Sequence, residues 1–185
     1  MTNIARSIRT PADADVANRN VRRVSQQIIA KTQRAYLREF MWLLDARLDS
    51  ADKTHPTCFG RFRIPAATYT KTPQRYVGCP EAIVCVNQLA CVAWAELLEE
   101  GLVDCQMTPG QFMDLPPSSM NMFDIRRLRF KKALPKDKEF EGAITLDSYR
   151  PGDLTIVVAA FTIGDGAIVG EGSFVISSAL GDASQ

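Results

Sequence analysis

The chain has 185 residues, of which 46 % are hydrophobic and 23 % are charged, which suits a single globular domain. Its 22 Lys and Arg residues and 21 Asp and Glu residues give a formal net charge of +1, so composition offers no reason to expect a nucleic-acid-binding protein. The only histidine is His55, which excludes a His-rich metal site and leaves few ways to build a catalytic pair that needs imidazole.

The cysteines and the N-terminal sequence indicate a reducing compartment. There are five cysteines, an odd number, and no pair has the Cys-x-x-Cys spacing of a zinc or redox site. Residues 1–20 are polar and lack the apolar stretch of a signal peptide. No apolar run reaches the roughly 18 residues of a membrane span. We therefore expect a cytoplasmic protein with no metal site and no membrane span.

The N-terminal third predicts an arm, a helix and a hairpin. Residues 1–20 have little to bury, so we expect a disordered arm. From 21 to 38 apolar residues recur at helical spacing, which predicts an amphipathic helix. The period then changes to two, and residues 41–64 predict a β-hairpin whose loop carries His55.

The strongest helix signal runs from Pro80 to Glu100. Proline suits the first helical position, Glu81 suits the first turn, and Gly101 is a natural stop. Residues 81–95 are apolar nearly all round, which is typical of a buried helix.

After a loop-rich stretch at 102–119, the remaining chain predicts β-structure. The Gly-Asp-Gly sequence at 164–166 is typical of a hairpin turn, and a bulge is expected at Arg126 and Arg127. The expected strands are 123–134, 140–149, 154–163 and 167–178.

These elements predict an α+β fold. Short turns between strands favour an antiparallel sheet, and the apolar helix favours the hotdog fold, in which such a sheet is wrapped around a long central helix. We expect a single hotdog domain over 21–180, a flexible tail over 181–185, and dimerisation that shields the sheet edges.

Two amides interrupt the most apolar part of the long helix. Burying an amide without a partner costs about 1–3 kcal/mol, so both Asn87 and Gln88 need an explanation. For Asn87 the alternatives are a tie between the helix and sheet backbone and a site role, and we favour the site role, since an amide N–H suits a thioester carbonyl or the oxyanion formed from it. For Gln88 two interpretations stay open: a tie between helix and sheet backbone, or a contact to substrate.

Other candidates are phenol, carboxylate and hydroxyl groups near this helix. Tyr69 precedes the helix and Tyr36 ends the first one, and either could donate a hydrogen bond in a site or simply pack in the core. Glu81 could act as a general base or be a solvated first-turn carboxylate. Ser118 and Ser119 are candidate substrate contacts, or plain loop hydroxyls after two prolines.

Several segments together resemble the FcoT family of fatty acyl-CoA thioesterases, which have the hotdog fold. The most specific is the helix sequence Cys-Val-Asn-Gln-Leu-Ala at 85–90. Gly-Arg-Phe-Arg-Ile at 60–64, Ser-Ser-Met at 118–120 and Arg-Phe-Lys-Lys-Ala-Leu at 129–134 also resemble the family. The similarity extends over roughly residues 36–180.

The resemblance implies an enzyme that acts on a long acyl chain carried as a pantetheine thioester, on coenzyme A or on an acyl carrier protein, with no further cofactor. It also implies a homodimer or higher homo-oligomer. Asn87 matches the family's helix asparagine and Tyr69 its loop tyrosine, whereas Tyr36 matches a second tyrosine only with a gap.

The resemblance also implies a second candidate reaction, because some members of the family act in natural-product biosynthesis and add glycine to a 2-enoyl thioester before hydrolysis. That reaction needs a cation for the glycine carboxylate, and Arg75 or Arg127 would suit. The basic run 126–132 could meet coenzyme A phosphates or an acidic carrier protein. The alternatives are a non-catalytic acyl-thioester sensor or carrier-protein-binding module, and a hotdog dehydratase, for which His55 is poorly placed.

Overall fold

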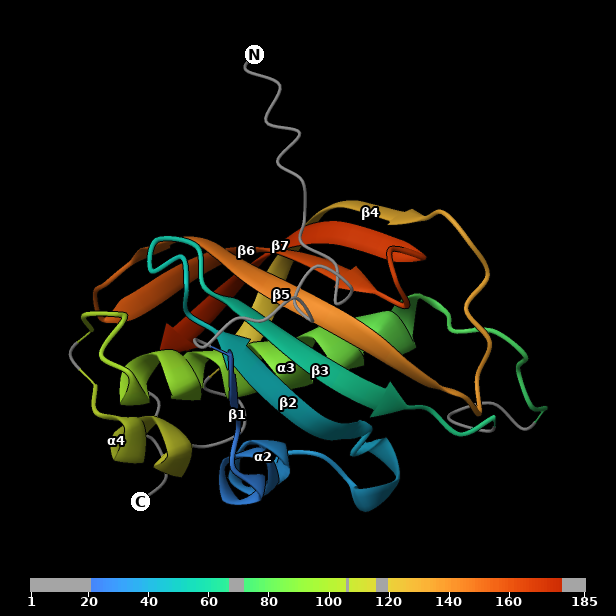
Figure 1. Ribbon diagram of the computed structural model, residues 1–185, viewed down its shortest axis with the longest axis horizontal. Helices are drawn as coiled ribbons and strands as arrows, with labels where there is room; N and C mark the ends of the chain where they lie inside the picture. The colour runs from blue at the N-terminus through green and yellow to red at the C-terminus, as the bar shows by residue number, and fades with distance from the viewer. Residues whose placement is uncertain (1–20, 67–71, 106, 116–119, 178–185) are drawn as a thin grey trace, which may run out of the picture.

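A computed structural model describes residues 21–66, 72–105, 107–115 and 120–177 of the chain. Its main feature is one seven-stranded sheet in the order β1-β2-β3-β5-β6-β7-β4, in which every neighbouring pair is antiparallel (Figure 1). The strands are β1 Val21–Arg23, β2 Leu43–Asp49, β3 Thr57–Arg63, β4 Met120–Phe130, β5 Glu139–Arg150, β6 Leu154–Ile163 and β7 Ile168–Ser177.

A helical layer covers one face of this sheet (Figure 1). The longest helix, α3, packs against β2, β3, β4 and β5, and α2 and α4 pack against α3 in turn. The helices are α2 Gln26–Gln33, η1 Arg38–Phe40, α3 Cys79–Glu99 and α4 Pro109–Asp114.

The α3 helix forms where the sequence predicts a helix, between residues 79 and 99. Pro80 lies in its first turn, and the Glu81 carboxylate accepts a hydrogen bond from the Gly78 N–H at 3.0 Å. This cap satisfies one of the free N–H groups at the helix start. The helix ends at Glu99 with Glu100 as its C-cap, and Gly101 adopts the left-handed backbone (φ 62°) typical of a C-terminal stop.

The fold class expected from the sequence, an α+β hotdog fold with a sheet wrapped around a long central helix, is corrected by the structure. The described chain is only 26 % helical and is mostly β, a seven-stranded antiparallel sheet. The physical reason lies in the apolar surface of α3. Because α2 and α4 cover the parts of α3 that the sheet leaves free, all-round apolarity does not require a sheet that encloses the helix.

Two local predictions also need correction. Residues 21–38 are not one helix: β1 pairs with β2 over 21–23, and α2 begins only after the Ser25 cap. Within the stretch expected to be loop, 109–114 forms α4. The Thr108 side chain accepts from the Gln111 N–H and the Gln111 side chain accepts from the Thr108 N–H, which is a capping box that the sequence already displays.

The predicted hairpins are confirmed. β2 and β3 pair across the turn that holds His55, and β6 and β7 pair in continuous register across the turn at 164–166. The expected bulge is also present, since the register of β4 against β7 shifts between Arg126 and Arg129 and Arg127 has a positive φ of 56°. The predicted arm at 1–20 and tail at 181–185 lie outside the described residues.

Within the part of the chain that the structure describes, α3 is the one helix long and apolar enough to cross a membrane by length and composition. However, 72 % of its most apolar window is buried inside the fold. Its apolarity is thus explained by packing against the sheet and the other helices.

Candidate active site

A pocket opens between the helical layer and the start of β4. Its walls come from four parts of the chain: α2 with the residues that follow it, α3, α4 with Leu115, and the first residue of β4. The lining residues are Lys31, Thr32, Arg34, Ala35, Tyr36, Asn87, Cys91, Phe112, Met113, Leu115 and Met120.

Two of the predicted catalytic residues, Asn87 and Tyr36, meet in this pocket. Asn87 Nδ2 donates a hydrogen bond to Tyr36 Oη at 3.0 Å. Asn87 Oδ1 is buried and has no hydrogen-bond partner among the described residues. A buried acceptor without a donor is costly, and in a pocket it is a place for a water molecule or a ligand N–H or O–H.

The Tyr36 phenol remains protonated over the ordinary pH range. Burial raises the pKa of Tyr36 well above its usual value of 10, and Cys91 raises it further. Since Tyr36 Oη accepts from Asn87, its own proton is available to a third group. Burial also raises the pKa of Cys91 to about 12, so this thiol is a neutral part of the wall and not an activated nucleophile.

Gln88, the neighbour of Asn87, has a structural role. Its Oε1 accepts from the backbone N–H groups of Trp42 and Leu43 at 3.2 and 3.1 Å, and its Nε2 donates to the carbonyl of Phe40. The side chain is 1 % exposed and does not line the pocket. The substrate-binding role considered for Gln88 is therefore replaced by the other interpretation, a tie between α3 and the start of β2.

Glu81 also has a structural role. The carboxylate is fully buried, caps α3 through the Gly78 N–H, and forms an ion pair with the buried Lys136. It does not line the pocket. We therefore replace the general-base hypothesis for Glu81 with that of an anchor between α3 and the loop before β5.

The rim of the pocket is cationic and its depth is apolar. Arg34 is exposed, and its guanidinium Nη2 donates to the Leu115 carbonyl at 3.0 Å, which joins the end of α2 to the segment after α4. Lys31 lies one turn earlier on α2. Phe112 and Met120, in contrast, are buried. No carboxylate occurs among the described residues that line the pocket.

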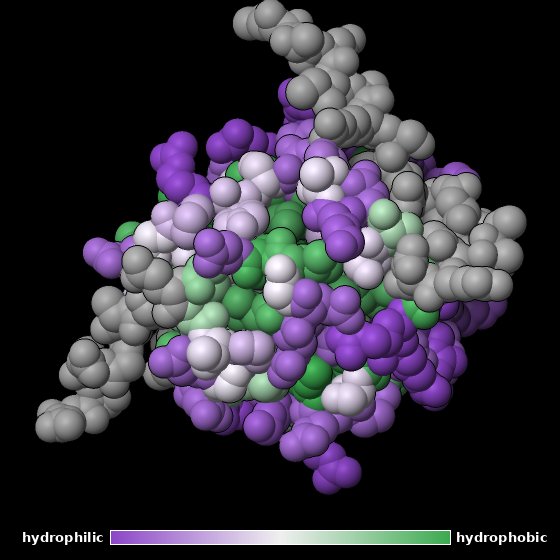
Figure 2. All heavy atoms as spheres, turned by 60° about the vertical axis from the view of Figure 1, so that its left-hand side comes forward, coloured by the Kyte–Doolittle hydropathy of each residue, from purple (hydrophilic) through white to green (hydrophobic). Residues whose placement is uncertain are grey.

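A second, narrow apolar pocket lies between α3 and the sheet. Met120 lines both pockets, so the two are neighbours. Figure 2 views the molecule from the side on which α4 lies in Figure 1, and there hydrophobic residues reach the surface within a hydrophilic surround. The second pocket is lined by Leu48, Pro56, Cys58, Ala90, Ala93, Trp94, Leu97, Met120, Ile144, Leu146, Val157, Ala159 and Phe174.

Three of the other candidates, Tyr69, Ser118 and Ser119, lie outside the described residues. Arg127 points its guanidinium at Glu171, with Nη1 3.2 Å from the carboxylate, and Arg75 is exposed before α3. Neither arginine lines the pocket, so the expectation that one of them serves it is not supported by the described residues.

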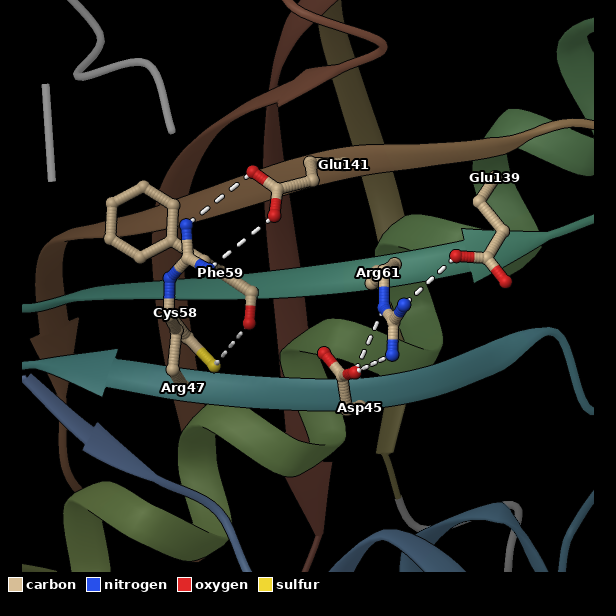
Figure 3. Close-up of polar contacts among 7 residues, drawn as sticks. All are labelled: Asp45, Arg47, Cys58, Phe59, Arg61, Glu139 and Glu141. Carbon is tan, nitrogen blue, oxygen red and sulfur yellow. Dashed lines mark hydrogen bonds and ion pairs between the residues drawn. The ribbon is translucent and has the colours of Figure 1, made fainter. Parts of the chain in front are cut away.

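A network of ion pairs lies away from the pocket, across β2, β3 and β5. Arg61 pairs with Asp45 on one side and with Glu139 at 2.9 Å on the other (Figure 3). Next to it Arg47 pairs with Glu141 at 3.4 Å and lies 5.2 Å above the centre of the Phe59 ring. Arg47 and Arg61 are each neutralised by a cross-strand carboxylate, so the network stabilises the pairing of the strands.

Sequence reasoning missed Lys31, Arg34 and Phe112 as pocket residues. The capping box before α4 could have placed a helix at Phe112. No local signal could have brought α4 and the end of α2 to Asn87, because those contacts join residues far apart in the sequence.

Comparison with known proteins adds no assignment. No protein-family model matches the chain, and no curated protein matches it either.

Proposed function

We propose that the chain hydrolyses acyl thioesters of pantetheine, the reaction implied by its resemblance to the FcoT thioesterases. The observation that carries the proposal is that Asn87 and Tyr36 are hydrogen-bonded to each other in a pocket. The Tyr36 O–H is still available as a donor, and the buried Asn87 Oδ1 is still available as an acceptor. A thioester hydrolase needs these two functions: a donor to the carbonyl oxygen and an acceptor for the attacking water.

In this mechanism the Tyr36 O–H donates to the thioester carbonyl oxygen, where negative charge develops. Its raised pKa suits this role, because the group stays a donor and does not lose its proton. Asn87 Nδ2 orients the phenol, and Asn87 Oδ1 accepts a hydrogen bond from the attacking water. The water oxygen bonds to the carbonyl carbon and the C–S bond breaks. The water gives up one proton and the departing thiolate takes up one, so the protein supplies no net proton.

The second pocket is narrow, and its apolar walls suit an alkyl chain that parts them on entry. Its lining is aliphatic and aromatic, and it lies next to the Asn87 pocket at Met120. An alkyl chain entering it would leave water at a gain of about 0.8 kcal/mol for each buried CH₂.

Glycine addition to a 2-enoyl thioester would need the same carbonyl donor and, in addition, a cation for the glycine carboxylate. Arg75 and Arg127 do not line the pocket, so no described contact favours this second reaction through them. Product masses with and without glycine distinguish the two: hydrolysis gives the free enoic acid in both cases.

The test is Asn87→Ala, assayed for release of free thiol from an acyl-CoA. We expect kcat to fall about a hundredfold, as for loss of one preorganised polar group at a reacting carbonyl. Thr32→Ala is the matched control, since Thr32 lines the same pocket but its hydroxyl is engaged by the carbonyls of Ile28 and Ile29 at 3.0 Å each.

Thr32→Ala should keep the wild-type rate. Undiminished turnover in Asn87→Ala, with its fold verified by circular dichroism, would refute the proposal. Tight acyl-CoA binding by the wild-type protein without any turnover would instead identify a sensor.

A further inference from the structure

The cations at the pocket rim differ from most of the arginines on the sheet. Arg47, Arg61, Arg126 and Arg127 each face a carboxylate. Lys31 and Arg34 have no ion-pair partner among the described residues, although they line a pocket. An uncompensated pair of cations at the mouth of a pocket attracts an anion.

The geometry favours a fixed anion site over a mobile pair of side chains. The Leu115 carbonyl holds Arg34 through Nη2 at 3.0 Å, which places the guanidinium between two walls of the pocket and leaves its other N–H groups for a ligand. Guanidinium groups bind phosphate oxygens through paired N–H donors, and a lysine adds a compact charge. Lys31 is three residues before Arg34, so the two side chains lie on the same face at the end of α2.

The burial of the lining residues indicates which kind of anion fits the pocket. Arg34 is exposed, Lys31, Asn87 and Tyr36 are half-buried, and Phe112 and Met120 are buried. A pantetheine thioester likewise runs from a solvated phosphate through a neutral arm and the thioester to an apolar chain.

We infer that Lys31 and Arg34 bind the phosphate that joins the pantetheine arm to its carrier, which coenzyme A and an acyl carrier protein share. This inference rests on the proposed function, because it takes the thioester to lie at Asn87. It assigns the selection of phosphopantetheine substrates to the end of α2, separate from the groups that polarise the carbonyl.

The experiment compares one acyl group on three thiols: coenzyme A, a phosphopantetheinylated carrier protein, and N-acetylcysteamine, which has no phosphate. In Lys31→Ala and Arg34→Ala we expect KM to rise about tenfold for the first two substrates, with kcat nearly unchanged. Kinetics with N-acetylcysteamine thioester should not change. Arg150→Ala, which removes an exposed arginine that does not line the pocket, is the matched control.

Three results would overturn the inference. Unchanged KM values would show that the rim does not bind the phosphate. Equal losses with all three substrates would indicate a structural effect, since basic residues also stabilise the C-terminal end of a helix. A rise in KM with the coenzyme A substrate alone would show that the two residues contact the nucleotide of coenzyme A and not the phosphate that both carriers share.

A failure of the proposed function is recognised separately. If no thioester is hydrolysed, binding of coenzyme A measured by titration calorimetry still tests the rim: weaker binding in both variants supports the phosphate site, and equal binding refutes it. If N-acetylcysteamine thioester is hydrolysed with dependence on Asn87 but the rim variants match wild type, only the phosphate site fails.

Discussion

Asn87 and Gln88 are the same kind of residue one position apart, yet they serve different ends. Successive residues of a helix point about 100° apart, so Gln88 faces the backbone at the start of β2 and Asn87 faces the pocket. The sequence was sufficient to mark both amides as needing partners. It was not sufficient to choose between partners, because Trp42 and Tyr36 lie some fifty residues away along the chain.

The buried ion pair between Glu81 and Lys136 leads to a prediction at the residue scale. Glu81→Gln leaves a lysine ammonium in the interior without its carboxylate, and such losses cost about 3–5 kcal/mol. We expect a matching fall in the free energy of unfolding, measured in urea. Turnover per folded molecule should be retained, because Glu81 does not line the pocket.

The control for this change is Glu141→Gln, which breaks a half-exposed pair with Arg47 and should cost at most about 1 kcal/mol. A Glu81→Gln protein as stable as wild type but without activity would contradict the structural assignment and restore the general-base hypothesis.

At the scale of elements, periodicity predicted most strands but not the walls of the site. Residues 154–163 are β-branched and apolar between clear turns, and β6 has these bounds. β1 was missed because three residues give no period, and its pairing with β2 is a tertiary contact. The fold class was wrong for a related reason: the apolarity of 81–95 shows that α3 is buried but not which elements bury it.

The packing of α3 on β3 leads to a second prediction. A Cβ added at Gly60 would lie 2.7 Å from a Leu43 methyl and 2.8 Å from a Leu89 methyl, and both leucines are buried. Gly60→Ala should therefore force α3 and β3 apart and lower the free energy of unfolding by about 1–3 kcal/mol. Thermal unfolding followed by circular dichroism measures the change.

Gly172→Ala is the strand-matched control, because its added Cβ would meet the nearest atom, on the Phe174 ring, at an ordinary contact distance of 3.5 Å. We expect it to be close to neutral. Equal stability of the two variants would show that the leucines move aside without cost and would refute tight packing at Gly60.

For the whole molecule, the net charge of +1 conceals an uneven distribution. The outer network of β2, β3 and β5 alternates in sign and is neutralised across strands, whereas the pocket rim has two cations and, among the described lining residues, no carboxylate. A balanced total charge is thus compatible with a local anion site, which composition alone could not predict.

The buried Cys58 and Cys85 thiols, with the half-buried Cys91 thiol and Tyr36 phenol, make the stability of the whole molecule sensitive to alkali. Burial raises the pKa of the Cys58, Cys85 and Cys91 thiols above their usual value near 9, that of Cys91 to about 12, and raises the pKa of Tyr36 as well. Between pH 9 and 12 the unfolded chain therefore loses protons that the folded protein keeps. The folded state binds more protons in this window, so the free energy of unfolding must fall as pH rises.

Cys91→Ala tests this directly. A group that is ionised in the unfolded chain and neutral in the folded protein lowers the free energy of unfolding by about 1.4 kcal/mol per pH unit. Cys91→Ala removes one such group, so between pH 9 and 11 the variant should lose less stability than wild type. This holds whatever the stability of the variant at pH 7. Urea unfolding at pH 8, 9.5 and 11 gives the two slopes. Parallel curves would mean that the Cys91 thiol ionises equally in the folded and unfolded chain. Cys91 would then be open to water, and the wall that shields Asn87 and Tyr36 would not be closed there.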